Sequence, residues 1–327
     1  MNSSTSSSKN AEWKVVAVLA TAFLLFEIVA RILAPTLDYD RVHIHALPGI
    51  VEEIGDDKRP RVVLLGNSLL MHGADGELLE EEISRATSGP CSVTKITPVG
   101  TAIRDWNYLY DTYFTEQNTH PDVVVVGFVA HHIPDQCELK MRRLTRHFCS
   151  LRNLWDCLQR EGPTFDDKVV GALSHFSALY GDQPEHHWTV NSFTVPEFGR
   201  GARKINDILG GEAGRKAWKK EEPDSSPALP PRTYQKLARL IETFRKHGVK
   251  AYFVPMPQPE SWNFDPAAAE VIVDNGATLV DGRAIAGMTQ ADFPDGYHLG
   301  ETGTIRFTRF LARALADELS AGIALSP

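Results

Sequence analysis

Three residues near opposite ends of the sequence have the side chains that nucleophilic catalysis uses. Ser68 follows a short apolar run at residues 61–65, and Asp295 and His298 lie three residues apart near the carboxyl end. A carboxylate that accepts a hydrogen bond from one imidazole nitrogen leaves the other nitrogen to take a hydroxyl proton. The residue types and their order therefore predict a Ser–His–Asp arrangement. The alternatives are that Ser68 only caps a helix and that the Asp–His pair only shapes a surface turn.

An alternation of apolar runs and amphipathic segments predicts how these residues are positioned. The runs are typical of buried parallel strands, and the segments are typical of helices that cover both faces of a sheet, so the expected fold class is α/β. Ser68 follows the first strand and the loop with Asp295 and His298 follows the fifth, which places both at the sheet edge where open α/β sheets bind ligands. The expected strands are residues 61–65, 91–96, 122–128, 250–254 and 278–280, and the expected helices are 76–86, 103–114, 234–247, 267–275 and 302–319.

The alternation pauses between residues 134 and 231, and this pause predicts an insert. The flanking segments, 61–133 and 232–327, then form the two parts of one domain. Segment 134–231 is expected to be a helical insert or lid after the third strand.

Within the insert, apolar residues from Cys137 to Leu158 recur at alternating intervals of four and three residues. This spacing predicts one helix of about six turns with a single apolar stripe. On such a helix Cys149 and Cys157 would lie about 12 Å apart, which is beyond disulfide reach. A disulfide would need a break in the helix or a partner elsewhere, and free buried thiols are the alternative.

The amino end differs in composition from the rest of the chain. Residues 1–12 are rich in Ser, Thr and Asn and predict a disordered tail, and residues 35–60 predict a polar connector. The apolar segment 13–34 between them is long enough to cross the about 30 Å hydrocarbon core of a bilayer. Its length and flanking residues favour an uncleaved single-pass anchor over a cleaved signal peptide or a buried core helix.

Composition narrows the class of protein. Lys and Arg number 34 and Asp and Glu number 42, so the net charge is −8, and a mildly acidic chain is not expected to bind nucleic acid. The four Cys are too few for a disulfide scaffold. No phosphate-cradling glycine loop is present, and the pair His186-His187 has no convincing third ligand nearby. Neither a cofactor nor a metal is therefore expected.

Two segments of the sequence give a family resemblance. VVLLGNSLLMHG and DGYHLGETG resemble the first and last motif blocks of the SGNH/GDSL hydrolase superfamily. The resemblance implies that Ser68 is the nucleophile and that His298 and Asp295 complete a triad. It also implies a flavodoxin-like, three-layer α/β/α parallel sheet. A further implication is an oxyanion hole made of the backbone amides of Ser68 and Gly100.

One block departs from the superfamily pattern. Its third block, G-x-N-D, supplies an Asn side chain to the oxyanion hole, whereas residues 127–132 read GFVAHH and lack the Asn. Removal of one oxyanion donor typically costs about 10²–10³ in rate. His131 or His132 could act as a substitute donor, or the two histidines could only shape the loop.

The layout of anchor, α/β domain and helical insert is similar to that of envelope proteins for alginate O-acetylation and teichoic-acid D-alanylation. This similarity implies a domain outside the cytoplasmic membrane, an acyl-ester or glycan substrate and an envelope acyltransferase as partner. The expected function is a membrane-anchored serine acyl-ester hydrolase or O-acyltransferase that acts through an acyl-enzyme. The alternatives are a non-catalytic binding or assembly protein of envelope polymer modification, and a flavodoxin-like cofactor binder.

Overall fold

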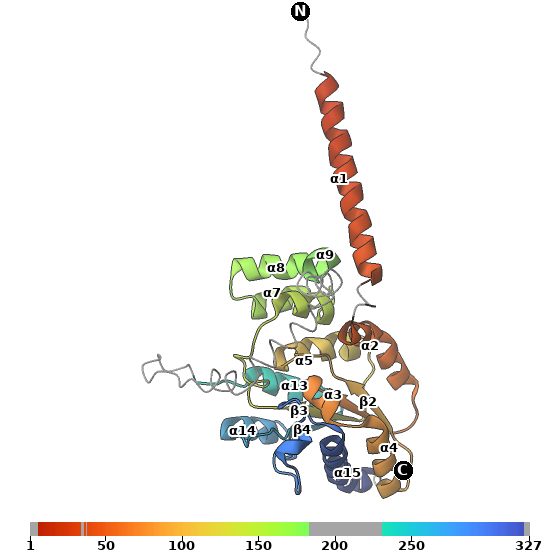
Figure 1. Ribbon diagram of the computed structural model, residues 1–327, viewed down its shortest axis with the longest axis vertical. Helices are drawn as coiled ribbons and strands as arrows, with labels where there is room; N and C mark the ends of the chain where they lie inside the picture. Colours follow the sequence, from red (N-terminus) through yellow and green to blue (C-terminus); the bar gives the residue numbers. More distant parts are fainter. Residues whose placement is uncertain (1–5, 34–35, 37, 183–230, 324–327) are drawn as a thin grey trace, which may run out of the picture.

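The computed structural model describes residues 6–33, 36, 38–182 and 231–323, and within these residues it contains a five-stranded parallel sheet (Figure 1). The strand order, β2-β1-β3-β4-β5, is that of flavodoxin-like doubly wound sheets. It confirms the predicted α/β class, and each strand begins and ends within one residue of its expected position. The strands are β1 (Arg61–Leu65), β2 (Ser92–Ile96), β3 (Val123–Phe128), β4 (Lys250–Pro255) and β5 (Thr278–Leu279).

Helices cover both faces of the sheet. They are α2 (Tyr39–Asp56), α3 (Ser68–Gly73), α4 (Gly76–Thr87), α5 (Ile103–Tyr110) with the π-helical turn η2 (Asp111–Thr115), α13 (Gln235–Lys246), α14 (Pro266–Asp274) and α15 (Glu301–Ile323). Successive strand residues face opposite sides. Val63 and Leu65 pack with α2, α5, α13 and α14, whereas Val62 and Leu64 pack with α3, α4 and α15. The result is a three-layer α/β/α domain.

A long helix at the amino end, α1 (Ser6–Leu33), extends away from this domain (Figure 1). It begins inside the segment expected to be a disordered tail, of which residues 1–5 lie outside the described part of the chain. The stretch from Glu12 to Leu33 is long and apolar enough to cross a membrane, and only 11% of its most apolar window is buried. The described residues thus contain one N-terminal apolar helix of spanning length.

The expected connector at residues 35–60 is instead mostly the helix α2, whose inner face is part of the core. Ile44, Leu47, Val51 and Ile54 are buried at helical spacing against the sheet. Pro48 lies inside the helix, and together with the Gly and charged residues around it this Pro obscures the apolar periodicity in the sequence. The prediction of a polar connector was therefore wrong for most of this segment.

The expected six-turn helix of the insert is also wrong, because it breaks into shorter elements. These are α6 (Met141–Arg143), the π-helical turn η3 (Leu144–Phe148) and α7 (Leu154–Glu161), followed by α8 (Phe165–Phe176) and α9 (Ala178–Gly181). Cys149 has extended backbone, and the Asn153 side chain accepts a bond from the Ser150 backbone at 2.9 Å. Such local side-chain bonds compete with helical ones and explain the break.

The four cysteines are buried and form no disulfides. Because the helix breaks between Cys149 and Cys157, the spacing argument for a long separation does not apply to them. Burial and the neighbouring Cys157 thiol both raise the pKa of Cys149. Cys137, Cys149 and Cys157 belong to the core cluster on the α5 side of the sheet, and Cys91 belongs to the cluster on the α4 side. The remainder of the expected insert, residues 183–230, lies outside the described residues, as does the pair His186-His187.

A buried carboxyl in α5 gives a prediction about stability. Asp105 accepts a hydrogen bond from the Ala102 backbone at 3.0 Å, and its burial raises its pKa from 3.8 to about 6. A carboxyl with a raised folded-state pKa destabilises the fold fully above that pKa and not at all below its unfolded value. We expect Asp105→Asn to gain about 2–3 kcal/mol of unfolding free energy relative to wild type between about pH 4 and about pH 7.

Urea unfolding of both proteins across this range checks the expectation about Asp105. The comparison uses the change with pH, so any fixed cost of burying the amide cancels. A constant difference between the two proteins at all pH values would contradict it.

Candidate active site

Ser68 lies just after strand β1, at the carboxyl edge of the sheet. Asn67, not Ser68, caps α3, because its Oδ1 accepts a hydrogen bond from the Leu69 backbone at 3.0 Å. The Ser68 hydroxyl is therefore not used as the helix cap. Gly66 is required before this turn, since a Cβ there would lie 3.0 Å from Leu70 side-chain atoms and 3.2 Å from the carbonyl oxygen of Gly127.

Asp295 and His298 lie in the loop after β5, at the same edge of the sheet. Gly296 has φ +78°, a conformation that favours glycine, and it forms the turn between Asp295 and His298. The carboxylate Oδ2 lies 2.7 Å from Nδ1 of His298, and its Oδ1 accepts the backbone N–H groups of Tyr297 at 2.9 Å and of His298 at 2.7 Å. The imidazole is thus fixed at both ring and backbone.

The structure brings the three predicted side chains together. Nε2 of His298 lies 3.0 Å from Oγ of Ser68, across 230 residues of sequence. Burial alone would raise the pKa of Asp295, but hydrogen bonds from His298 and Tyr297 outweigh it and hold the pKa below its usual value. An ionised Asp295 favours the imidazole tautomer with a proton on Nδ1, and that tautomer leaves Nε2 to accept the serine proton.

His72 is a neighbour of this group that the sequence analysis missed. It lies one helical turn after Ser68 on α3, and its ring centroid is 4.9 Å from that of His298. Burial, with a smaller contribution from His298, lowers the pKa of His72. An open pocket of about 530 Å³ lies beside the two rings and is also lined by Asp295 and Thr304. The signal in the sequence that could have identified His72 is its position four residues after Ser68, which places both residues on the same face of a helix.

The loop after β2, which contains Gly100, is fastened to the turn that holds Ser68. The hydroxyl of Thr101 donates to the carbonyl of Gly66 at 2.9 Å, and Nδ2 of Asn67 donates to the carbonyl of Thr101 at 2.9 Å. Thr101 is thus bonded directly to the turn that contains Ser68, and its neighbour Gly100 is held close to that turn. Its role as an oxyanion donor stays a prediction.

The two histidines after β3 have different environments. His132 is buried, its Nδ1 accepts the backbone N–H of Val129 at 3.2 Å, and its Nε2 lies 3.1 Å from Nδ2 of Asn67. Burial lowers the pKa of His132 to about 3, so this ring is neutral. His131 is exposed and packs edge-on against His132, with ring centroids 4.2 Å apart. These contacts support the loop behind Ser68, and a donor role for either ring stays a prediction.

The insert contributes a cation near the loop after β2. Nζ of Lys140 lies 3.3 Å from the carbonyl oxygen of Gly100. Lys140 also pairs with Glu138 at 3.6 Å. Two arginines further along the insert form ion pairs too: Arg143 contacts Asp40 at 2.6 Å, and Arg146 contacts Asp182, which follows α9, at 3.6 Å. The sequence analysis did not connect Lys140 with the site, because its position depends on how the insert folds back.

A metal site is not visible in the described part of the chain. No group of three or more His, Cys, Asp and Glu side chains there is placed to hold a metal ion.

Comparisons with known proteins find similarity in structure only. No protein-family model and no curated protein sequence matches the chain. A lipase/acylhydrolase from Enterococcus faecalis aligns with a TM-score of 0.39 and 11% identity, over 79% of this chain and 96% of that one. An acetylxylan esterase from Geobacillus stearothermophilus aligns with a TM-score of 0.38 and 12% identity, over 80% and 94%. A G-D-S-L family lipolytic protein from Desulfitobacterium hafniense aligns with a TM-score of 0.37 and 10% identity, over 78% and 98%. The structural matches are thus to lipases and esterases, at identities of 10–12%.

Proposed function

We propose that this chain is a serine acyl-ester hydrolase or O-acyltransferase with Ser68, His298 and Asp295 as its catalytic residues. The observation that carries the proposal is the chain of two contacts, 3.0 Å from Ser68 Oγ to His298 Nε2 and 2.7 Å from His298 Nδ1 to Asp295. Both distances are within the reach of a nucleophile, a base and an orienting carboxylate. The group lies at the edge of β1, beside the point where the strand order reverses, which suits a ligand site.

The geometry supports a two-step reaction. Ser68 Oγ attacks the carbonyl carbon of an ester while its proton passes to Nε2 of His298, and Asp295 stabilises the imidazolium. The tetrahedral intermediate then releases the alcohol, which takes the proton from Nε2, and leaves an acyl-serine. Water or a sugar hydroxyl then attacks the carbonyl carbon of the acyl-serine and gives its proton to Nε2 of His298. The bond to Ser68 Oγ breaks, Oγ takes this proton back from Nε2, and the acid or the acylated sugar leaves.

The oxyanion hole of this site is the part that departs from the superfamily. The backbone amides of Ser68 and Gly100 are the proposed donors, and Val129 occupies the place of the Asn side chain in the third block. One missing donor would reduce turnover by about 10²–10³ relative to a complete hole. We therefore expect slow hydrolysis of simple esters.

We also propose that α1 anchors the protein in a membrane, with the α/β domain on the extracytoplasmic side and an envelope carbohydrate ester as substrate. The low burial of the apolar window of α1 argues against a core helix. Glu27 of α1 accepts hydrogen bonds from Ser177 and from the backbone of Ala178. A helix bonded in this way to the folded domain suits an anchor better than a cleaved signal peptide.

A fluorophosphonate probe tests the catalytic proposal, because it phosphonylates a serine whose hydroxyl an adjacent base activates and expels fluoride. We expect the folded full-length chain to form one adduct, located on Ser68 by peptide mass spectrometry. Ser68→Ala and heat-denatured protein should form none, and Ser84→Ala, a change outside the site, should label like wild type. A folded chain that does not react, or reacts at another serine, would favour the binding and assembly role.

A further inference from the structure

Helix α8 of the insert packs with its small residues inward and its large apolar residues outward. Gly171 and Ser174 are buried, and a Cβ at Gly171 would lie 2.6 Å from the Leu158 side chain and 3.1 Å from the sulfur of Met141. A surface helix of a water-soluble domain has the reverse arrangement. The outer face of α8, as we define it, consists of Phe165, Val169, Leu173 and Phe176, which are 79%, 38%, 51% and 61% exposed.

The residues of this outer face form one continuous stripe. Their spacing of four, four and three residues places them on the same side of the helix. Contiguous exposed apolar surface of this kind marks a site that contacts a protein or a membrane. The identity of the occupant follows from what lies next to the stripe.

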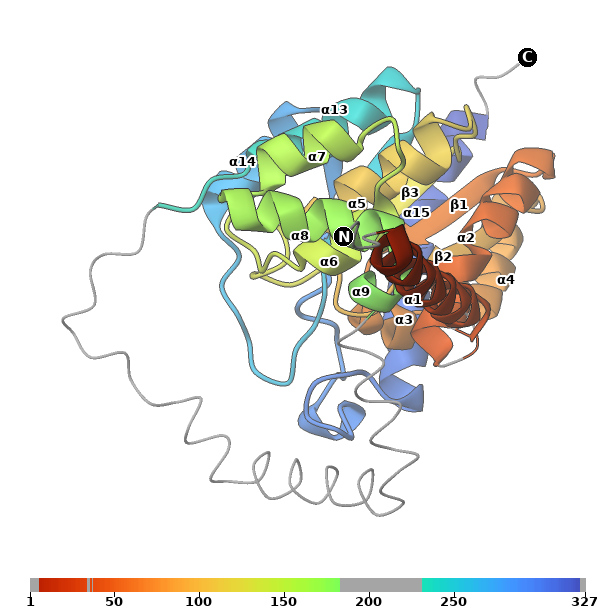
Figure 2. The ribbon, with the colours of Figure 1, turned by 90° about the horizontal axis from the view of Figure 1, so that it is seen from above.

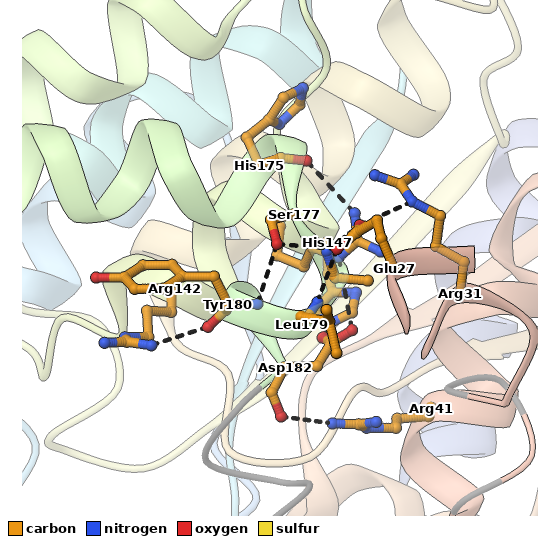
Figure 3. A network of polar contacts seen from close by, with 12 residues as sticks. Glu27, Arg31, Arg41, Arg142, His147, His175, Ser177, Leu179, Tyr180 and Asp182 are labelled. Carbon is orange, nitrogen blue, oxygen red and sulfur yellow. Dashed lines mark hydrogen bonds and ion pairs between the residues drawn. The ribbon is translucent and has the colours of Figure 1, made fainter. Parts of the chain in front are cut away.

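Helix α1 lies against the end of α8, through a charged pair that contacts the insert. Glu27 is 8% exposed, and its carboxylate accepts the backbone N–H groups of Ala178 at 2.6 Å and Leu179 at 3.2 Å. Arg31 pairs with Glu27 at 2.9 Å (Figure 3). Arg31 also donates to the backbone carbonyl of Phe176, the last residue of the outer face. The carboxyl end of the outer face of α8 therefore lies beside the candidate membrane-spanning helix.

The position of Glu27 along α1 sets the depth of α8. Glu27 lies six residues before Leu33, or about 9 Å along the helix axis. The 22 residues from Glu12 to Leu33 measure about 33 Å, only slightly more than the hydrocarbon core. If α1 spans the bilayer with Leu33 at the edge of the hydrocarbon core, Glu27 lies about 9 Å below that edge, and the insert bonded to it reaches into the outer part of the core. Figures 1 and 2 show α8 running across the direction of α1 at this end, as an interfacial helix would.

We propose that the outer face of α8 is embedded in the lipid interface beside α1, so that a spanning helix and an interfacial helix hold the insert together. This inference rests on the proposed membrane anchor. The partner is the lipid bilayer itself, at the depth of about 5–10 Å that interfacial amphipathic helices reach. Two attachment points would fix the orientation of the α/β domain, and hence of Ser68, relative to the membrane surface.

Fluorescence quenching in vesicles tests this placement. The full-length chain is reconstituted in phosphatidylcholine–phosphatidylglycerol vesicles after single replacements by Cys, each labelled with the fluorophore NBD. Leu173→Cys reports on the outer face of α8. Val18→Cys, 67% exposed on α1, reports on the anchor, and Val273→Cys, 59% exposed on α14, is the matched apolar control. The unsubstituted chain gives the background from the four buried native cysteines.

We expect lipids with doxyl groups on their acyl chains to quench the labels at residues 173 and 18 severalfold more than the label at 273. Circular dichroism should give the same spectrum for all three proteins. If the label at 18 is quenched and the label at 173 behaves like that at 273, the anchor holds and the α8 proposal fails. If the emission at 173 is blue-shifted without lipid quenching, a second copy or another protein covers this face, which also overturns it. If the label at 18 is not quenched, the proposed membrane anchor is wrong, and the α8 proposal, which rests on it, fails with it.

Discussion

Replacement of Ser68 by Ala is expected to lower the rate at which the full-length chain hydrolyses 4-nitrophenyl acetate by at least about 10³-fold. Loss of a serine nucleophile costs about 10⁶ in a complete triad enzyme, and the missing oxyanion donor lowers the wild-type rate by about 10²–10³, so the measurable difference is correspondingly smaller. The substitution removes one half-buried hydroxyl at the edge of the sheet and should leave the unfolding midpoint unchanged. Initial rates at equal concentrations of folded protein measure the effect.

A matched substitution separates chemistry from folding in this experiment. Ser84→Ala removes a hydroxyl in the last turns of α4 that accepts the backbone N–H of Cys91 at 3.2 Å and takes no part in the contacts of the triad. It should hydrolyse the ester at the wild-type rate. A Ser68→Ala protein as fast as wild type would refute the assignment of the nucleophile.

The parts of this molecule that the sequence predicts well depend on local patterns. The run at residues 123–126 is four consecutive valines that end up fully buried in β3, and such a run is typical of a parallel strand covered on both faces. The spacing of Asp295 and His298 with a Gly between them limits the loop to a tight turn, and the contact at 2.7 Å follows from it. The meeting with Ser68 could be expected because parallel strands end at one edge of a sheet.

The parts that the sequence does not predict depend on contacts between distant segments. One face of helix α2 packs against the sheet, but from the sequence alone Pro48 predicts a break in this helix. The apolar stripe of the insert continues through residues 149–153 in sequence, yet Leu151 is 70% exposed because Ser150 and Asn153 form a turn there. His72 approaches His298 only because α3 and the loop after β5 lie at the same edge. These outcomes are decided by tertiary packing, which periodicity cannot report.

Replacement of Asp295 by Asn is expected to lower turnover by about 10⁴-fold. If the wild-type rate exceeds the uncatalysed rate by less than this factor, the variant should show only the uncatalysed rate. The Asn side chain can still accept the backbone N–H of His298, but its amide group would face Nδ1 of the ring and donate to it. The ring would then keep its proton on Nε2, the tautomer that cannot accept a proton from Ser68. The carboxylate oxygens are bonded to the backbone of Tyr297 and His298 and to the His298 ring. The loss should therefore fall on kcat and leave KM within about twofold.

Because hydrogen bonds hold the pKa of Asp295 below its usual value, the wild-type carboxylate stays ionised as the pH falls towards that value, and the acid side of the profile does not report its protonation. Asp281→Asn is the matched control, since it breaks an exposed pair with Arg283 on the loop after β5 and should change kcat less than about twofold. If Asp295→Asn lost no more activity than Asp281→Asn, the orienting carboxylate would lie elsewhere and the Ser68–His298 contact would act as a dyad.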